Sequence, residues 1–248
     1  EVNNFQKKLA IKFFSDLLRS WVWGWCDVRN RYRRSTFGPF WETINIAVLI
    51  GGMAIISGAL FNINTLSILP YLGLGVIFWT VISNSISDGA DCFISNSVYL
   101  QNSNMGIGLF VGRTIFRIYI TSAHHLILFA LAVFALPIQI NYNSMLIIPG
   151  ITLLFLNSVW VIGVLGLICA RYRDMKMIVK NLTQLLFFVT PIFWSAEFIP
   201  ERKRFILDFN PLYYYLEIVR APLLGKTPPL QIYLVTGALT ILGFSLFY

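Results

Sequence analysis

Long apolar runs separated by short polar connections are the dominant pattern of this chain. Each run approaches the roughly 20 residues that a helix needs to cross about 30 Å of hydrocarbon. The six runs cover residues 41–61, 68–92, 114–137, 145–170, 177–195 and 230–248. The pattern therefore predicts an all-α integral membrane protein with six transmembrane helices.

The first forty residues follow a different pattern. Between residues 5 and 25, large apolar side chains recur every four positions, and Lys8, Lys12 and Arg19 lie opposite them. This spacing predicts an amphipathic interface helix in the headgroup plane. Such a helix serves either as a simple membrane anchor or also as a contact for a partner. An elbow that ends near residue 40 then leads into the first span.

The stretch 196–229, between the fifth and sixth runs, is typical of neither a span nor a solvated loop. Pro191, Pro200, Pro211 and Pro222 divide this part of the chain into pieces that are too short to cross a bilayer. The basic residues 202–204 need water or headgroups, whereas residues 212–224 are strongly apolar. These features predict two short re-entrant helices, which persist at membrane depth only where protein or a water-filled cavity covers them.

The second of these short helices has a recognisable start. Asn210 is well suited to cap it, and Pro211 fits its first turn because the missing N–H has no acceptor there. We expect Arg202 and Arg204 to reach water or headgroups. We expect residues 213–216 to pack against the spans.

Composition and charge agree with a membrane location and orient the chain. Hydrophobic residues make up 57% and charged residues 12%, well below the about 25% of a soluble domain. The net charge of +8 arises mainly from Lys and Arg before the first span and in the connections after the second and fourth spans. The positive-inside rule therefore predicts a cytoplasmic N-terminus, and the charge gives no reason to invoke nucleic acid.

One cytoplasmic connection, residues 94–106, is polar but uncharged and rich in Asn, Ser and Gln. It is expected to form a short helix and turn, as an ordinary connection or as a docking surface for a soluble partner.

Glu1 is not an initiator methionine, and the last apolar run reaches Tyr248. We therefore expect a few further residues at the ends, including a basic tail after Tyr248.

The sequence lacks the motifs of nucleotide binding, metal binding and hydrolytic catalysis. There is no G-x-x-x-x-G-K-[ST] phosphate-binding loop, metal-ligand spacing or Ser/His/Asp arrangement. We therefore expect no catalytic residue, cofactor or metal in this chain. His124 and His125 lie near the middle of the third span, where a proton relay or an interhelical hydrogen bond is conceivable. No acidic residue at that depth completes a relay.

Several segments together resemble the membrane subunits of type-2 ABC exporters of polysaccharides and polyol phosphates. The resemblance extends over nearly the whole chain and is strongest to permeases that export lipid-linked O-antigen polysaccharide. Capsule and teichoic acid exporters share much of the pattern. The matching residues include Arg31, Arg33, Arg34, Gly38, Pro39, Trp41, Ala170, Arg171, Asp174, Gln184, Thr190, Pro191, Trp194, Pro200, Asn210, Pro211, Arg220, Pro222 and Gly225.

The resemblance implies a single permease domain over residues 1–248. Its parts are the interface helix and elbow (1–40), spans one to five (41–195), a periplasmic gate region (196–229) and span six (230–248). It further implies a homodimer in the bacterial inner membrane that rests on two copies of a separate ATPase, which binds ATP and Mg²⁺. A lipid-linked polysaccharide would pass through a channel between the two permease copies. An ion-coupled secondary transporter and a membrane enzyme acting on lipid-linked sugars are the more distant alternatives.

The resemblance also assigns residues to roles. Within 94–106, the ATPase coupling helix would use Ser95, Asn96, Ser97, Val98, Tyr99, Leu100 and Gln101. Two gate helices, 197–208 and 211–222, would carry the gate residues Pro200, Arg202, Arg204, Asn210, Pro211 and Arg220.

Aromatic residues make up 16% of the chain, and they suit a sugar cargo. Sugar rings present apolar C–H faces that stack on aromatic rings, and this weakly directional contact lets a long chain slide. Most aromatic residues must still be core or lipid-facing. The candidates for a glycan channel are Phe78, Trp79, Phe188, Phe193, Tyr213 and Tyr214.

Overall fold

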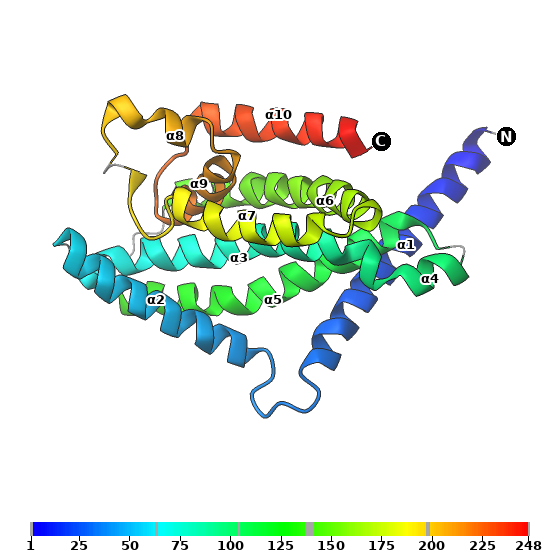
Figure 1. Cartoon of the computed structure of the whole chain (residues 1–248), viewed down its shortest axis with the longest axis horizontal. Helices are drawn as coiled ribbons and strands as arrows, with labels where there is room; N and C mark the ends of the chain where they lie inside the picture. Colours follow the sequence, from blue (N-terminus) through cyan, green and yellow to red (C-terminus); the bar gives the residue numbers. More distant parts are fainter. Residues whose placement is uncertain (1, 63, 104, 137–140, 197–198, 248) are drawn as a thin grey trace.

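The computed structural model describes residues 2–62, 64–103, 105–136, 141–196 and 199–247, and over these residues the fold is helical (Figure 1). Side chains are described from residue 15 onward, except that of Phe61. The α-helices are α1 (Val2–Arg31), α2 (Phe40–Phe61), α3 (Thr65–Ser95), α4 (Ser97–Asn102), α5 (Ile107–Ala135), α6 (Ile147–Arg171), α7 (Met175–Val189), α8 (Phe205–Asp208), α9 (Pro211–Leu223) and α10 (Leu230–Phe247). Two 3-10 segments, η1 (Tyr142–Leu146) and η3 (Glu201–Lys203), complete the described elements.

Five of these helical segments are long and apolar enough to cross a membrane. They are Phe40–Leu60, Thr65–Ser95, Ile107–Ala135, Tyr142–Arg171 and Leu230–Phe247. The all-α membrane class predicted from the sequence is therefore confirmed. The helices of the second and third runs begin earlier than predicted, at Thr65 and Ile107.

The predicted fifth span, 177–195, is shorter in the structure. Helix α7 has 15 residues, about 22 Å of rise, and ends at Val189. Pro191 disfavours helical geometry in the preceding residue, and Thr190 is extended with φ −84° and ψ 137°. The apolar run continues beyond this point, so hydropathy alone places the end of the helix too late.

Helix α3 runs through the middle of the bundle and contacts α2, α5, α6, α7 and α9. Its inner face contributes Leu74, Ile77 and Phe78 to the main core, where Phe110 from α5 and Leu216 from α9 also lie. Small residues allow close approach, as is common between membrane helices. A Cβ atom on Gly89 would lie 2.9 Å from the Cα atom of Ile162 on α6.

Helix α1 crosses the bundle obliquely and packs along α5, near the end that carries α4 (Figure 1). Ser20 donates a hydrogen bond of 3.2 Å to the backbone oxygen of Leu109. Trp21 packs edge-on against Phe116, with ring centroids 5.3 Å apart. The predicted N-terminal helix is therefore present and extends beyond 5–25, whereas the apolar side chains predicted at residues 5–13 lie outside the described ones.

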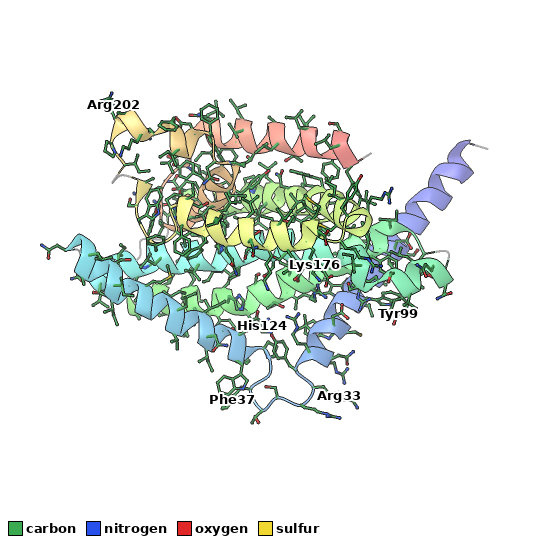
Figure 2. All side chains as sticks on the ribbon, in the orientation of Figure 1. Arg33, Phe37, Tyr99, His124, Lys176 and Arg202 are labelled. Carbon is green, nitrogen blue, oxygen red and sulfur yellow. The ribbon has the colours of Figure 1, made fainter. Side chains whose placement is uncertain are left out.

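The region between α7 and α10 contains one substantial helix. Helix α9 matches the predicted short helix 211–222 and is buried along most of its length. The predicted helix 197–208 is replaced, over residues 199–208, by the 3-10 turn η3 and the single α-turn α8, and residues 197 and 198 lie outside the described part. The basic residues 202–204 are exposed as predicted, and Figure 2 shows Arg202 at the edge of the molecule.

Candidate functional site

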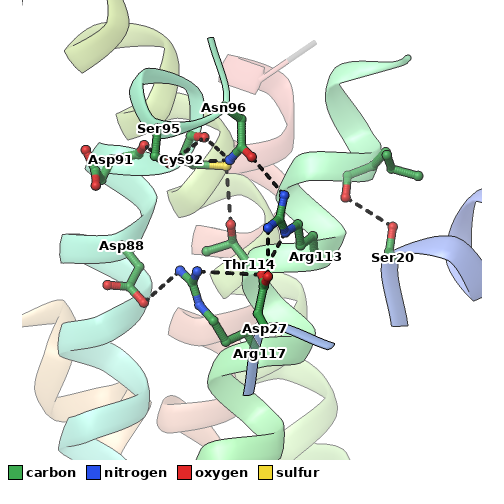
Figure 3. A network of polar contacts seen from close by, with 11 residues as sticks. Ser20, Asp27, Asp88, Asp91, Cys92, Ser95, Asn96, Arg113, Thr114 and Arg117 are labelled. Atoms are coloured by element: carbon green, nitrogen blue, oxygen red, sulfur yellow. Dashed lines mark hydrogen bonds and ion pairs between the residues drawn. The ribbon is translucent and has the colours of Figure 1, made fainter. Parts of the chain in front are cut away.

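A charged network joins the helices at the α4 end of the bundle (Figure 3). Arg113 on α5 binds Asp27 on α1 through two hydrogen bonds of 2.7 Å each, from Nε and Nη2. Its Nη1 atom donates a third hydrogen bond, 2.9 Å long, to Oδ1 of Asn96. One guanidinium group therefore links α1 to Asn96, the residue just before α4. Paired, planar contacts of this kind are strong and geometrically specific.

The same network reaches α3 from two directions. Arg117, one turn after Arg113, places Nη2 3.1 Å from Asp88 and Nη1 3.8 Å from Asp27. Asn96 donates from Nδ2 to the backbone oxygen of Cys92 at 2.7 Å. The ion pairs with Asp27 have side chains that are mostly covered, so water screens them less than it screens surface pairs. The network therefore links the start of α4 to α1, α3 and α5.

The expected coupling residues divide into two groups. Val98 and Tyr99 project outward from α4, with 66% and 53% of their surfaces exposed, and Gln101 is exposed beside them. Ser97 and Leu100 are half-buried, and Ser95 is exposed but donates to the backbone oxygen of Asp91. Asn96 differs from the others because it is 8% exposed and engaged with Arg113. It positions α4 rather than presenting a surface.

A groove runs between α3 and α7, with a volume of about 480 Å³. Its walls combine aromatic rings with hydroxyl, amide and ammonium groups: Trp79, Ser83, Ser87, Lys180, Thr183, Gln184, Phe187 and Phe188. Helix α7 contacts α3 through a narrow stripe that includes the buried Val179 and Thr183, and most of its other side chains are exposed. The exposed face carries Lys180 and Gln184, which are poorly suited to contact with lipid tails.

The structure brings together some of the proposed channel aromatics. Trp79 packs against Phe187 at 5.7 Å between ring centroids, and Phe187 also contacts Phe188 and Phe193 at 5.4 and 6.1 Å. Phe188 is 63% exposed and lines the groove. Phe78 and Tyr214 instead lie in the core, each 4% exposed, and Tyr213 is half-buried beside Tyr214. The sequence reasoning did not place Phe187 among the channel aromatics, although this residue connects the cluster.

Arg220 on α9 is fully buried and fastens the segment that follows α7. It binds Glu217 through Nη2 and Nε at 2.6 and 3.1 Å, and Nη1 donates to the backbone oxygen of Pro191 at 2.7 Å. Its guanidinium carbon lies 3.9 Å from the ring centroid of Tyr71 on α3. Gly75 leaves room for this arrangement, because a Cβ atom there would lie 3.2 Å from the backbone oxygen of Ile192. We call these contacts the Arg220 clasp.

The other end of α9 is fastened to the same segment. Oδ1 of Asn210 accepts a hydrogen bond of 3.0 Å from the N–H of Leu212, which confirms the predicted cap. Its Nδ2 atom donates to the hydroxyl of Thr190 at 3.1 Å. Pro211 occupies the first turn as predicted. Pro200 precedes η3 and is exposed, and Arg202 and Arg204 are exposed within and just after that turn.

A model of the ABC-2 type transporter family matches residues 20–224. The chain belongs to this ABC-2 family. Two relatives from Klebsiella pneumoniae, each called O-antigen export system permease protein RfbA, are 20% and 22% identical to it over 229 residues. Each match covers 89% of this chain and 87% of the relative. The ABC-2 permease is thus a multi-pass inner-membrane transport subunit, not itself a catalytic one, and its family implies an ATPase partner.

Sequence reasoning missed one polar centre of the ABC-2 permease. Asn157 on α6 accepts hydrogen bonds at Oδ1 from the Tyr215 hydroxyl at 2.9 Å and from Trp160 at 2.8 Å. Its Nδ2 atom donates to Thr240 on α10 at 2.7 Å. A lone Asn in an apolar run was the available signal, because a buried amide requires partners.

Neither histidine of α5 forms an interhelical hydrogen bond among the described residues, which was one of the two roles considered from the sequence. His124 contacts the backbone oxygen of Ile120 on its own helix at 2.8 Å. His125 is 1% exposed, and neither ring nitrogen has a partner among the described residues. Neither histidine forms a relay with an acidic group of the described chain.

Proposed function

We propose that this ABC-2 permease is the membrane subunit of an ATP-driven exporter of lipid-linked polysaccharide of the O-antigen type. The observation that carries the proposal is the groove between α3 and α7, taken with the names of the two relatives. Aromatic rings there suit the apolar faces of sugars, and hydroxyl and amide groups suit their oxygen atoms. In this proposal the glycan moves along the groove from the cytoplasm to the periplasm.

The exposed face of α7 supports a channel between two copies. Lys180 and Gln184 on that face need water or protein around them, and the exposed Phe188 needs an apolar partner. A second permease copy facing this helix would satisfy both needs. We therefore propose a homodimer in which α7, completed by residues 190–194, acts as the sixth membrane crossing beside the five long helices.

The α4 end supports docking of the ATPase, and residues 199–223 support a gate at the opposite end. Val98 and Tyr99 form an exposed apolar pair on the uncharged α4, which suits insertion into a partner's cleft. The network through Asn96, Arg113 and Asp27 would carry the motion of the ATPases into the bundle. Segment 199–209 with α9 would then cover the periplasmic exit.

The test is export of a lipid-linked glycan by the permease reconstituted with its partner ATPase. Phe188→Ala should slow export while the complex still assembles and hydrolyses ATP. Phe134→Ala is the matched control, since Phe134 is 90% exposed on α5 and outside the groove. Equal export by the two variants would remove the groove from the pathway. No ATP-dependent export by the unmodified complex would refute the function itself.

A further inference from the structure

The elbow between α1 and α2 carries guanidinium groups that the network at the α4 end does not use. Arg31, Arg33 and Arg34 line a polar hollow of about 430 Å³ together with Asn30. None of these three arginines forms an ion pair with a carboxylate of the described residues. Three neighbouring cations without counterions create a strongly positive local potential that favours an anion.

Local hydrogen bonds hold this hollow against the start of α2. The Tyr32 hydroxyl donates to the carboxylate of Glu42, so the one acidic group nearby is already engaged. Among the described residues, Glu42 therefore binds Tyr32 and forms no ion pair with the arginines of the elbow. The turn is completed by the N–H of Gly38, which donates to the Ser35 hydroxyl at 3.2 Å, and by the positive φ of 56° at Gly38.

An apolar groove of about 640 Å³ begins at the same elbow and follows α2 and α5. Phe37 and Phe40 stand at its mouth, only a few residues after the arginines. Its lining residues are Phe37, Phe40, Thr43, Ile44, Ala47, Val48, Ile127, Leu128 and Leu131. Figure 2 shows Arg33 and Phe37 together at this elbow. The positive hollow and the apolar groove therefore lie at the same elbow, three residues apart in sequence between Arg34 and Phe37.

One polar atom lies among these apolar walls. The hydroxyl of Thr43 is buried and has no partner among the described residues. A buried hydroxyl without a partner is costly, and this one is covered by the surrounding side chains rather than exposed in the groove. The other lining side chains carry no hydroxyl, amide or charge, so the groove suits a hydrocarbon chain and does not suit a sugar.

We propose that this elbow and groove bind one anionic phospholipid of the membrane. Its phosphate lies on the guanidinium groups of residues 31–34, and one acyl chain occupies the groove between α2 and α5. The arrangement matches an amphiphile in both charge and shape, whereas a zwitterionic lipid brings no net charge to the cluster. The bound lipid braces the joint between the interface helix and the first span. This site is separate from the groove between α3 and α7.

The test measures lipids retained by the full chain after delipidation, by native mass spectrometry in micelles with phosphatidylglycerol or phosphatidylcholine. Each basic residue near an anionic surface raises affinity about fivefold, so Arg33→Gln with Arg34→Gln should lower phosphatidylglycerol retention about 25-fold. Val48→Trp, which fills the groove, should lower it about tenfold with the charge unchanged. Helix content by circular dichroism verifies that each variant is folded.

Two matched controls separate a site from general surface charge. Arg171→Gln with Arg173→Gln removes two exposed arginines elsewhere, and Leu60→Trp enlarges an exposed position on α2 outside the groove. Both controls should retain phosphatidylglycerol like the unmodified chain. Equal loss in either control, or full retention by the Arg33/Arg34 or Val48 variant, overturns the proposal. Stronger retention of farnesyl diphosphate than of phosphatidylglycerol would assign the elbow to diphosphate carriers and overturn it as well.

Discussion

Replacing Arg220 by methionine should loosen the segment after α7 and lower the melting temperature of the permease. Arg220 is 0% exposed and donates three hydrogen bonds, two to Glu217 and one to the backbone oxygen of Pro191. Methionine preserves much of the apolar stem and removes every donor. Glu217 is then left without its cation, and the Pro191 carbonyl keeps only the distant Tyr71 hydroxyl at 3.4 Å.

The structure sets the size of this effect. Breaking a buried ion pair costs roughly 3–5 kcal/mol, and we take about 3 kcal/mol because the Glu217 side chain is 19% exposed and partly hydrated. For a chain of this size, each kcal/mol changes the melting temperature by about 2–4 °C. Arg220→Met should therefore melt about 6–12 °C lower. Arg220→Lys should lose less, because it retains the charge but not the paired contact or the stacking on Tyr71.

Scanning fluorimetry of the purified protein measures this difference, with Arg202→Met as the exposed control. Hydrogen exchange at residues 192–194 should increase in Arg220→Met and stay unchanged in the control. Adding Glu217→Gln to Arg220→Met should restore part of the stability, because the uncompensated carboxylate is gone. If Arg220→Met and Arg202→Met melt within about 1 °C of each other, the clasp does not stabilise this region.

Three further changes test other parts of the structure. Asp27→Asn should lower the free energy of unfolding by about 1–3 kcal/mol and reduce transport-coupled ATP hydrolysis, because Arg113 loses its charged partner. A denaturation curve measures the stability, and an ATPase assay of the complex measures the coupling. Normal coupling in this variant would exclude the network from communication between the ATPase and the permease. Asn210→Ala should cost about 1 kcal/mol through the lost cap and reduce export with the complex assembled, whereas equal loss of assembly would indicate a folding role. Burial and the hydrogen bond to Glu42 raise the pKa of Tyr32 from 10.0 to about 12, so its stabilisation is complete below pH 10 and disappears as the pH rises through 12. In Tyr32→Phe, unfolding curves should lose this component of the decline between pH 10 and 12, and an unchanged decline would contradict the assignment.

The parts that the sequence predicted well rest on local signals. Asn210 and Pro211 define the start of α9 because capping and proline geometry involve only neighbouring residues. The long apolar runs likewise predict the spanning helices directly. Hydropathy alone predicts that the α7 helix continues to residue 195, because the apolar run continues. Pro191, which is visible in the sequence, ends the helix at Val189 instead.

The parts that the sequence could not supply depend on distant pairings. Arg113 and Asp27 are 86 positions apart, and each resembles an ordinary interfacial charge until α1 folds against α5. Arg220 was expected among the external basic residues, yet Glu217 one turn earlier was a local hint of a buried pair. Phe78 and Trp79 are neighbours in sequence and both belong to the core, but only Trp79 also lines the groove, because successive helix positions face different directions.

The two ties between α9 and the segment after α7 have a mechanical consequence. Thr190 is bound to Asn210, the residue that caps α9, and Pro191 is bound to Arg220 near the other end of the helix. Because both ends of α9 are bound to two adjacent residues of the segment after α7, the helix is held to that segment and moves with it. A movement of α7 would therefore carry α9 with it, so in the proposed channel the width of the groove and the cover over the periplasmic exit would change together. A cross-link that immobilises either helix would arrest both.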